Sequence, residues 1–491
     1  MGKILETKIS RFDGGMLSEI RSKVASAAKL FKGFDILSYS NSLHPINSSE
    51  SGNDAPTTAI STFLYAESKL WGLGVKVAGG SIPKIFWKNT YNDAVWTSPA
   101  NGEGTLARDT NFFAYYKSAI YGFQSNGATG RIYKFATSGG AFTETDLAVN
   151  NTAPPSNGVV HSKDDMLYVG IDDKIYRKTN DTAWDTGGTG VVLTLSSGFV
   201  ITSICEYGNS LAIGGYSGNM SRVFLWDLDA ETWNDSIDWG EGYLQVLEEL
   251  EGNLMGISYF GNKVTTRYYA GVQGALEIPN LEIIGTSPNL SQHKQKTNGR
   301  LYFLLTTSIE SVNDTYGVWS IGKNKEGKLA VALEYLPNNN TAPGSIQGFY
   351  LVDNYYMFIG YIDGASAYQV SKTAYQVTTF SVNAIYESFI FDAGDPSQKK
   401  DFVGATVTYV PLPTAGSVTL KYKRDAETSF TTKTIFTDTT NDSISHSAIN
   451  IESTGEKIPE HKEIQFQITS TGGAIITGFS FQQDITGKRL Y

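Results

Sequence analysis

One phrase of hydrophobic and polar positions recurs seven times along the chain. In each copy a turn residue leads into a short apolar run that ends in or near glycine, and an aromatic strand follows. The copies are Lys69–Gly72, Ala119–Gly122, Met166–Gly170, Ser210–Gly214, Asn253–Gly256, Arg300–Leu304 and Tyr355–Gly360. Successive copies lie 43 to 55 residues apart, close to the length of one four-stranded propeller blade. The pattern predicts a β-propeller of six or seven blades over residues 59–390.

The fourth unit is the most regular of the seven. Its double glycine Gly214-Gly215, its aromatic strand Phe224–Trp226 and Trp233 after a polar turn resemble a kelch-type blade, although an ordinary hairpin containing Gly-Gly would also show them. A single blade cannot bury both of its faces, so radial packing of blades must bury the apolar residues between neighbours. Ring closure requires one more strand, from either the N-terminal segment or the end of the repeat region.

The regions on either side of the repeats follow different patterns. Residues 1–58 are interpreted as a short N-terminal arm, in which apolar residues at i, i+3, i+4 spacing predict a helix over 18–31. Residues 391–491 follow a turn-rich boundary, and strands are predicted near 403–410, 417–422, 430–436, 443–451, 463–468 and 474–481. Strict alternation gives two of them one apolar face each, formed by Val418, Leu420 and Tyr422 and by Ile464, Phe466 and Ile468. Six such strands predict an antiparallel β-sandwich or jelly roll, and the chain is expected to be all-β.

Composition and charge narrow the possible functions. The 491 residues carry a formal net charge of −10, which does not suit a surface built to neutralise nucleic-acid phosphates. Cys205 is the only cysteine, so neither an intrachain disulfide nor a thiolate metal site is expected, and this usage fits assembly in a reducing cytosol. No secretory signal and no run of 18 consecutive apolar residues is seen, and no membrane span is expected.

The sequence shows no motif of a known catalytic centre. It has no nucleophile elbow, zinc-protease motif or phosphate-binding loop, and Ala183–Gly187 only partly matches the repeated box of propeller sialidases. The five histidines, His44, His161, His293, His446 and His461, are far apart in sequence. We therefore expect no enzyme activity, no catalytic or cofactor-binding residue and no cofactor.

Acidic turns are the remaining candidates for a metal site. Asp227, Asp229 and Glu231 alternate in a turn and could offer oxygen ligands to Ca²⁺. The turn lacks the further ligands and the glycine that a calcium loop needs, so a solvated acidic turn is favoured, as it is for Asp164-Asp165 and Asp172-Asp173. No metal site is expected.

Four aromatic residues of the predicted blade loops could stack on sugars: Tyr91, Trp96, Trp233 and Trp239. Propellers also bury such residues between blades. We favour packing over sugar binding for these four.

Several short stretches on either side of the degenerate propeller are distinctive: Phe12–Met16, Phe34–Ile36, Leu43–Pro45, Phe391–Gly394, Lys399-Lys400, Val410–Leu412, Ser417–Asp425, Glu463–Phe466 and Gly472–Gly478. Together with the propeller, these stretches resemble those of tail nozzle proteins (tail tubular B-like) of short-tailed bacteriophages. The resemblance implies a virion protein, assembled in the host cytoplasm, whose copies form a ring, commonly of six, next to adaptor and other tail proteins. Such a ring lines the DNA-ejection channel, and an acidic lumen would let DNA slide through without specific binding.

A second function competes with this structural role. A carbohydrate- or receptor-binding propeller at the tail tip would have the same blades but would depend on exposed aromatic residues of its loops. An enzyme is the third possibility, and neither a motif nor an acid/base pair supports it.

Overall fold

The computed structural model describes a large part of the chain, and the regular elements in that part are all β-strands. The described residues are 3–12, 28–39, 41–45, 50–51, 60–74, 85–90, 93, 96–97, 109–126, 129–136, 143–144, 155–179, 190–261, 263–277, 281–282, 289–306, 317–325, 327–335, 343–353, 356–363, 368–374, 384–437, 446–450 and 458–485. Within them, no helix has the length and apolar character needed to cross a membrane. Contacts divide the chain into one unit of residues 1–48, 320–335 and 375–491 and another of residues 49–319 and 336–374.

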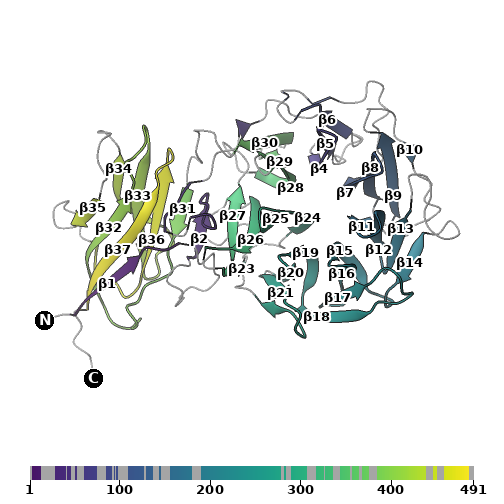
Figure 1. Cartoon of the computed structure of the whole chain (residues 1–491). Coiled ribbons are helices and arrows are strands. Elements are labelled where there is room, and N and C mark those ends of the chain that lie inside the picture. The colour runs from purple at the N-terminus through teal and green to yellow at the C-terminus, as the bar shows by residue number, and fades with distance from the viewer. Residues whose placement is uncertain are drawn as a thin grey trace. The chain divides into compact units, whose positions relative to one another are not determined.

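Seven sheets follow one another between residues 50 and 374 of the described chain and are arranged radially as propeller blades (Figure 1). Blade 1 consists of β4 (Ile60–Ala66), β5 (Lys69–Gly74) and β6 (Ile85–Lys88). Blade 2 consists of β7 (Asp109–Tyr116), β8 (Ala119–Asn126), β9 (Thr129–Ala136) and β10 (Thr143–Glu144). Blade 3 consists of β11 (Pro155–His161), β12 (Met166–Ile171), β13 (Lys174–Lys178) and β14 (Val191–Thr194). Blade 4 consists of β15 (Val200–Tyr207), β16 (Ser210–Ser217), β17 (Met220–Trp226) and β18 (Asp235–Glu241). Blade 5 consists of β19 (Tyr243–Leu250), β20 (Asn253–Phe260), β21 (Lys263–Tyr269), β22 (Leu276–Glu277) and β23 (Leu281–Glu282). Blade 6 consists of β24 (Asn289–Thr297), β25 (Arg300–Thr306), β26 (Gly317–Lys323) and β27 (Leu329–Tyr335). Blade 7 consists of β28 (Pro343–Val352), β29 (Tyr356–Asp363), β30 (Tyr368–Ala374) and β3 (Glu50–Ser51). The predicted all-β propeller is confirmed.

Two-residue turns join the first and second strands of several blades. Positive φ values occur at both central residues of Glu67-Ser68, Lys117-Ser118, Glu251-Gly252 and Asn298-Gly299. This is the turn type whose twist matches that of the flanking strands. The turns place the start of each repeated phrase at the start of the second strand.

The ring closes through strands that are distant in sequence. The first strands of the blades, β4, β7, β11, β15, β19, β24 and β28, contact one another in that order, and β28 also contacts β4. The N-terminal strand β3 is the outermost strand of blade 7, where Glu50 pairs with Lys372 and Ser51 with Ser371. The N-terminal segment, one of the two expected sources, therefore supplies the closing strand.

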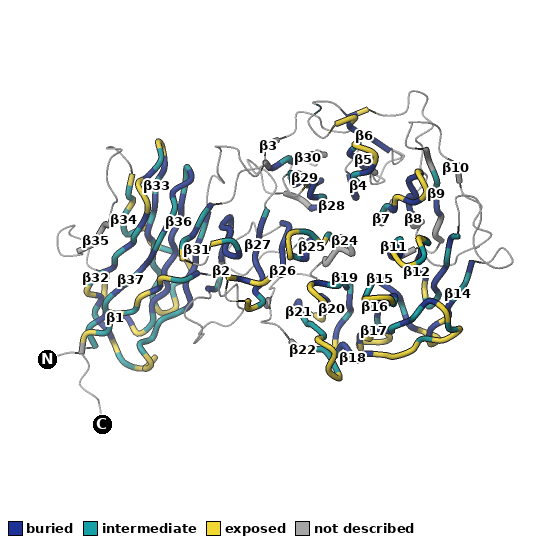
Figure 2. Tube along the Cα trace, viewed as in Figure 1, coloured by how far each residue is buried: buried dark blue, intermediate teal, exposed yellow. Residues whose placement is uncertain are grey.

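The glycine of the repeated phrase makes room for the next blade. A Cβ atom on Gly170 would lie 2.6 Å from a methyl carbon of Ile201, and one on Gly214 would lie 2.7 Å from a methyl carbon of Leu244. Ile201 and Leu244 belong to the first strands of the following blades. Figure 2 shows these second strands largely buried, and the glycines let the blades approach closely enough to exclude water.

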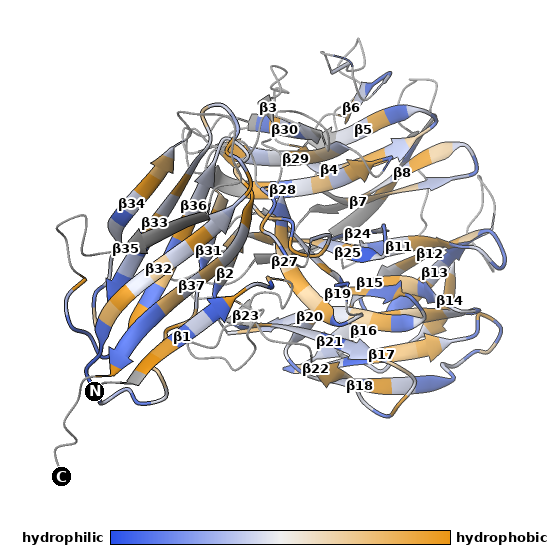
Figure 3. Ribbon diagram, turned by 60° about the vertical axis from the view of Figure 1, so that its left-hand side comes forward, coloured by the Kyte–Doolittle hydropathy of each residue, from blue (hydrophilic) through white to orange (hydrophobic). Residues whose placement is uncertain are grey.

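The unit of residues 1–48, 320–335 and 375–491 includes β27 and most of β26 from blade 6 and contains two further sheets. Their strands, in sheet order, are β1 (Lys3–Ile9), β37 (Ile476–Ile485), β32 (Asp401–Tyr409), β35 (His446–Asn450), and β2 (Leu30–Lys32), β31 (Ala384–Glu387), β36 (Ile464–Thr471), β33 (Ser417–Arg424), β34 (Thr431–Thr437). Phe466 of the second sheet lies 5.0 Å from Phe479 and 4.8 Å from Phe481 of the first, measured between ring centroids. Bands of hydrophobic residues lie between hydrophilic ones along these strands (Figure 3). The two sheets therefore pack face to face through aromatic side chains.

The six strands predicted after residue 391 are all present, and Val418, Leu420, Ile464, Phe466 and Ile468 are buried. The helix predicted over 18–31 is wrong at its end, because Leu30 and Phe31 lie in β2, which pairs with β31. Residues 18–27 of that prediction lie outside the described residues. The region interpreted as an arm contributes β1 to one sheet of the sandwich and β2 to the other. For β2, the packing of Phe31 against Tyr386 outweighs the local helical spacing.

Candidate functional site

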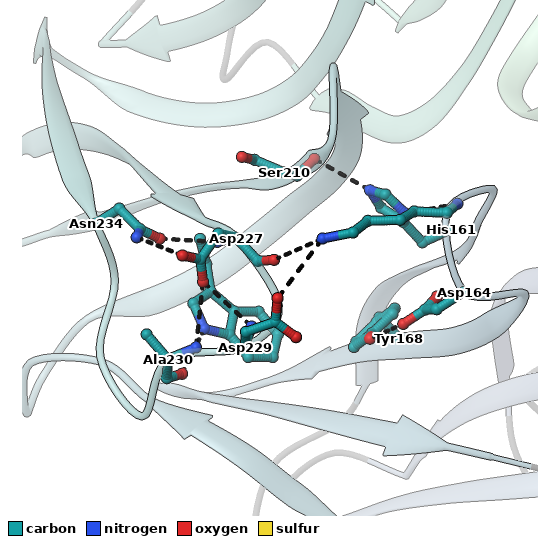
Figure 4. A network of polar contacts seen from close by, with 10 residues as sticks. His161, Asp164, Tyr168, Ser210, Asp227, Asp229, Ala230 and Asn234 are labelled. Atoms are coloured by element: carbon teal, nitrogen blue, oxygen red, sulfur yellow. Dashed lines mark hydrogen bonds and ion pairs between the residues drawn. The ribbon is translucent and has the colours of Figure 1, made fainter.

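In the acidic turn of blade 4, the carboxylate of Asp227 accepts hydrogen bonds from residues of the same turn. One carboxylate oxygen of Asp227 accepts from the backbone N–H groups of Asp229 and Ala230, both at 3.1 Å. The other accepts from Asn234 Nδ2 at 2.8 Å (Figure 4). The hydrogen bond from Asn234 and those from the two backbone amides lower the pKa of Asp227. Among the described residues, no group of three or more His, Cys, Asp or Glu could hold a metal ion.

The other acidic turns make similar local contacts. Asp164 accepts from the Met166 amide and the Tyr168 hydroxyl, Asp165 pairs with Lys117, and Asp173 lies 3.0 Å from Lys174 Nζ. These carboxylates act in turns and ion pairs rather than as a ligand set.

Polar contacts join neighbouring blades at one end of the propeller. We call this end the first-hairpin face, because it carries the turns between the first and second strands of each blade. Glu67 accepts from Tyr115 between blades 1 and 2, Lys117 pairs with Asp165 between blades 2 and 3, and Glu206 accepts from the Ser162 amide between blades 3 and 4. Between blades 5 and 6, Lys296 Nζ lies 2.7 Å from Glu249. These charges stabilise blade junctions.

A cavity of about 500 Å³ opens between the first hairpins of blades 4 and 5. Its lining residues are Glu206, Tyr207, Gly208, Glu249, Gly252 and Lys296. Burial tends to raise the pKa of Glu249, but hydrogen bonds from Lys296 and the Gly252 amide outweigh it and lower the pKa. Glu249 and Lys296 are thus paired with each other, while Glu206 accepts from the Ser162 amide.

Lys294 links three blades near the axis of the ring. From β24 of blade 6, its Nζ donates to the carbonyl oxygens of Ile204 in blade 4, at 2.8 Å, and of Leu247 in blade 5. It also lies 3.0 Å from a carboxylate oxygen of Glu248. The first strand of a blade is an edge strand, and the backbone groups on its free edge need hydrogen-bond partners. Lys294 is such a partner for two carbonyl oxygens.

The four histidines whose side chains the structure describes are not brought together as a catalytic set. His161 is buried and contacts the Ser210 carbonyl oxygen at 3.2 Å, while His44 stacks on Tyr39 with ring centroids 3.6 Å apart. Burial lowers the pKa of His293 to about 4. His461 is buried in the sandwich unit beside Gln483, and the side chain of His446 lies outside the described residues, as does the stretch Ala183–Gly187.

Three of the four aromatic residues weighed for sugar stacking are used for packing. Trp239 is fully buried, Trp96 is 9% exposed, and Trp233 is partly buried with its ring 4.9 Å from that of Phe224. Tyr91 lies outside the described residues.

A different aromatic cluster is partly exposed at the opposite end of blades 4 and 5. It consists of Tyr216, Tyr243, Tyr259 and Phe260, and we call it the tyrosine cluster. Sequence reasoning missed it. Tyr216 and Phe260 each stand beside a turn between the second and third strands, but with 28 tyrosines in the chain that position alone does not single them out.

Neither a family model nor a curated protein matches the chain. Among solved structures, a Dos1 propeller is similar at a TM-score of 0.46, with 11% identity over 70% of this chain and 98% of that one. YCF48 from Cyanidioschyzon merolae has a TM-score of 0.45, with 7% identity over 67% and 99% of the two chains. The WD40 repeats of RRP9 have a TM-score of 0.44, with 9% identity over 68% and 100%. Because these similarities are weak, the propeller assignment rests on the seven sheets themselves.

Proposed function

We propose that the chain is a non-catalytic structural subunit of a bacteriophage tail, of the ring-forming nozzle type. The observation that carries the proposal is that N-terminal and C-terminal stretches on which the resemblance to nozzle proteins rests belong to one structural unit and pair with each other. The Leu43 amide donates to the Ile476 carbonyl oxygen at 2.7 Å, and the Ile476 amide donates back at 3.2 Å. Strand β1 pairs with β37 from Lys3↔Ile485 to Ile9↔Phe479.

The pattern of charge use supports a structural role over an enzymatic one. In the part of the chain that the structure describes, the charged residues of the first-hairpin face pair mainly across blade junctions. A catalytic acid or base needs a free position facing a substrate. The proposed partners are further copies of this chain, an adaptor and other tail proteins, with DNA passing through the ring without specific binding, in a virion assembled in the host cytoplasm.

The mass and symmetry of the assembled protein test this proposal. We expect a closed homo-oligomeric ring, of six copies by the resemblance, in light scattering and in class averages from electron microscopy. A reconstruction should place acidic side chains on the lumen. A monomer at every concentration, including after incubation with a candidate adaptor, would overturn the ring proposal, and a basic lumen would overturn the proposed passage of DNA.

A second candidate function is a carbohydrate- or receptor-binding propeller. The tyrosine cluster favours it, because partly exposed aromatic residues gathered from two blades are typical of binding surfaces. This function does not depend on ring formation, so it can be tested on the purified chain in any oligomeric state.

A further inference from the structure

The tyrosine cluster brings together four aromatic rings from two neighbouring blades. Tyr243, the first residue of β19, pairs with Tyr259 of β20, and their ring centroids are 5.3 Å apart. Tyr216 of β16 meets Tyr243 edge-on, at 4.8 Å and 83°. Phe260, 42% exposed, lies 6.3 Å from Tyr243. Tyr243 is therefore the centre of the cluster and joins blade 4 to blade 5.

The three tyrosine hydroxyls are available to a ligand. All three side chains are partly buried, and no hydrogen bond within the described part of the chain engages their hydroxyls. Partly buried tyrosines usually find a partner for the hydroxyl. Burial, and then the neighbouring phenols of Tyr259 and Tyr243, raise the pKa of Tyr216, and burial and Tyr243 raise the pKa of Tyr259. The phenols thus lie near one another, and those of Tyr216 and Tyr259 stay uncharged at neutral pH.

The charges around the cluster favour an uncharged ligand. The adjacent Arg267 guanidinium donates to the Glu241 carbonyl oxygen and to Ser258 Oγ, at 3.1 and 3.3 Å, and the Glu241 carboxylate accepts from Asn219 at 3.3 Å. The cluster itself holds no charged side chain, whereas the first-hairpin face is densely charged. A net charge of −10 also repels polyanions at long range.

We infer that the tyrosine cluster is a binding site for a neutral saccharide. The aromatic rings offer apolar surface to the C–H face of a pyranose, and the three hydroxyls offer donors and acceptors to its hydroxyl groups. Exposed Met220, at 45%, and Phe260 extend the apolar surface along the second hairpins of the two blades. This inference rests on the second proposed function and places its site.

The test begins with the full-length protein on an array of neutral oligosaccharides, with sialylated and phosphorylated ones as anionic comparators. The strongest neutral binder is then titrated calorimetrically against Tyr243→Ala, Tyr216→Phe and Tyr259→Phe. We expect Tyr243→Ala to weaken binding about tenfold or more, since it removes the central stacking surface, and each Phe variant to weaken it about threefold. Tyr207→Ala, which changes a partly buried tyrosine of blade 4 at the opposite end, is the matched control and should bind normally.

The outcomes separate the site from the function. If no oligosaccharide binds, or if only anionic ones or proteins bind, the saccharide inference is overturned, and a complete absence of ligands also removes the binding function. If a neutral oligosaccharide binds and the three cluster variants retain wild-type affinity, the function stands and the site is wrong. Melting temperatures of all variants, and the graded effect of the Phe variants, distinguish loss of contacts from loss of folding.

Discussion

The side-chain amide of Gln295 pairs with both backbone groups of Leu351. Its Nε2 donates to the Leu351 carbonyl oxygen at 2.7 Å, and the Leu351 amide donates to its Oε1 at 2.6 Å. Gln295 thereby adds one ladder rung between the first strands of blades 6 and 7. Ser203 does the same between blades 4 and 5, donating to the Leu247 carbonyl oxygen and accepting from the Leu247 amide.

Replacing Gln295 should weaken the ring between blades 6 and 7. Gln295→Leu leaves the amide and carbonyl of Leu351 without their partner, and we expect the free energy of unfolding to fall by about 1–3 kcal/mol. Gln295→Glu keeps the acceptor for the Leu351 amide but places a carboxylate oxygen against the Leu351 carbonyl oxygen, so it should also destabilise the protein. Denaturant unfolding at neutral pH measures both, and a Leu variant as stable as the wild type would show that the rung contributes nothing.

Gly256 should not tolerate a methyl group. A Cβ atom there would lie 2.7 Å from Cζ2 of the fully buried Trp239 indole, a rigid ring that cannot move aside. We expect Gly256→Ala to destabilise the protein by about 1–3 kcal/mol. Trp239→Phe should recover part of that loss in the Gly256→Ala background, although it destabilises the wild type. Additive losses in the double variant would contradict this packing explanation.

Lys400 should be more important to stability than its neighbour Lys399. Its buried Nζ donates to the carbonyl oxygens of Asp395, Gln398 and Lys462 at 2.6, 2.7 and 2.7 Å. Lys400→Met keeps the length of the side chain but leaves these three carbonyl oxygens without a donor. We expect the free energy of unfolding to fall by about 2–4 kcal/mol.

Lys399→Met is the matched control for this change. It removes only an exposed ion pair with Glu460, and its effect should stay within about 0.5 kcal/mol. Thermal melting of both variants gives the comparison, and equal effects would refute the assigned role of Lys400.

Stability should fall on mild acidification partly because of His461. Burial lowers its pKa, outweighing the hydrogen bond to the Pro459 carbonyl, and Nε2 faces Gln483 Nε2 at 2.8 Å. The unfolded chain therefore takes up the proton first, near pH 6.5, so this contribution is complete above about pH 6.5 and is lost as pH falls toward the folded pKa.

The His461→Gln variant isolates that contribution. It cannot titrate, so its free energy of unfolding should change less between pH 7.5 and 5.5 than that of the wild type, each unit of pKa difference being worth about 1.4 kcal/mol. The pKa of His293 is lowered as well, and its titration leaves a residual slope. Identical pH profiles for variant and wild type would exclude His461 as a source.

Local patterns in the sequence determined the strands and much of the architecture. The repeated apolar-glycine phrase predicted a strand in each blade, and short apolar runs, two of them strictly alternating, predicted the six strands after residue 391, because each pattern reports which residues of one strand are buried. Tertiary structure decided what depends on partners far along the chain: Phe31 entered a strand against Tyr386, Glu50 and Ser51 closed the ring, Trp239 was buried, and Tyr243 came to lie beside Tyr216 at the surface. Exposure and pairing depend on which strands become neighbours, and no local pattern encodes that.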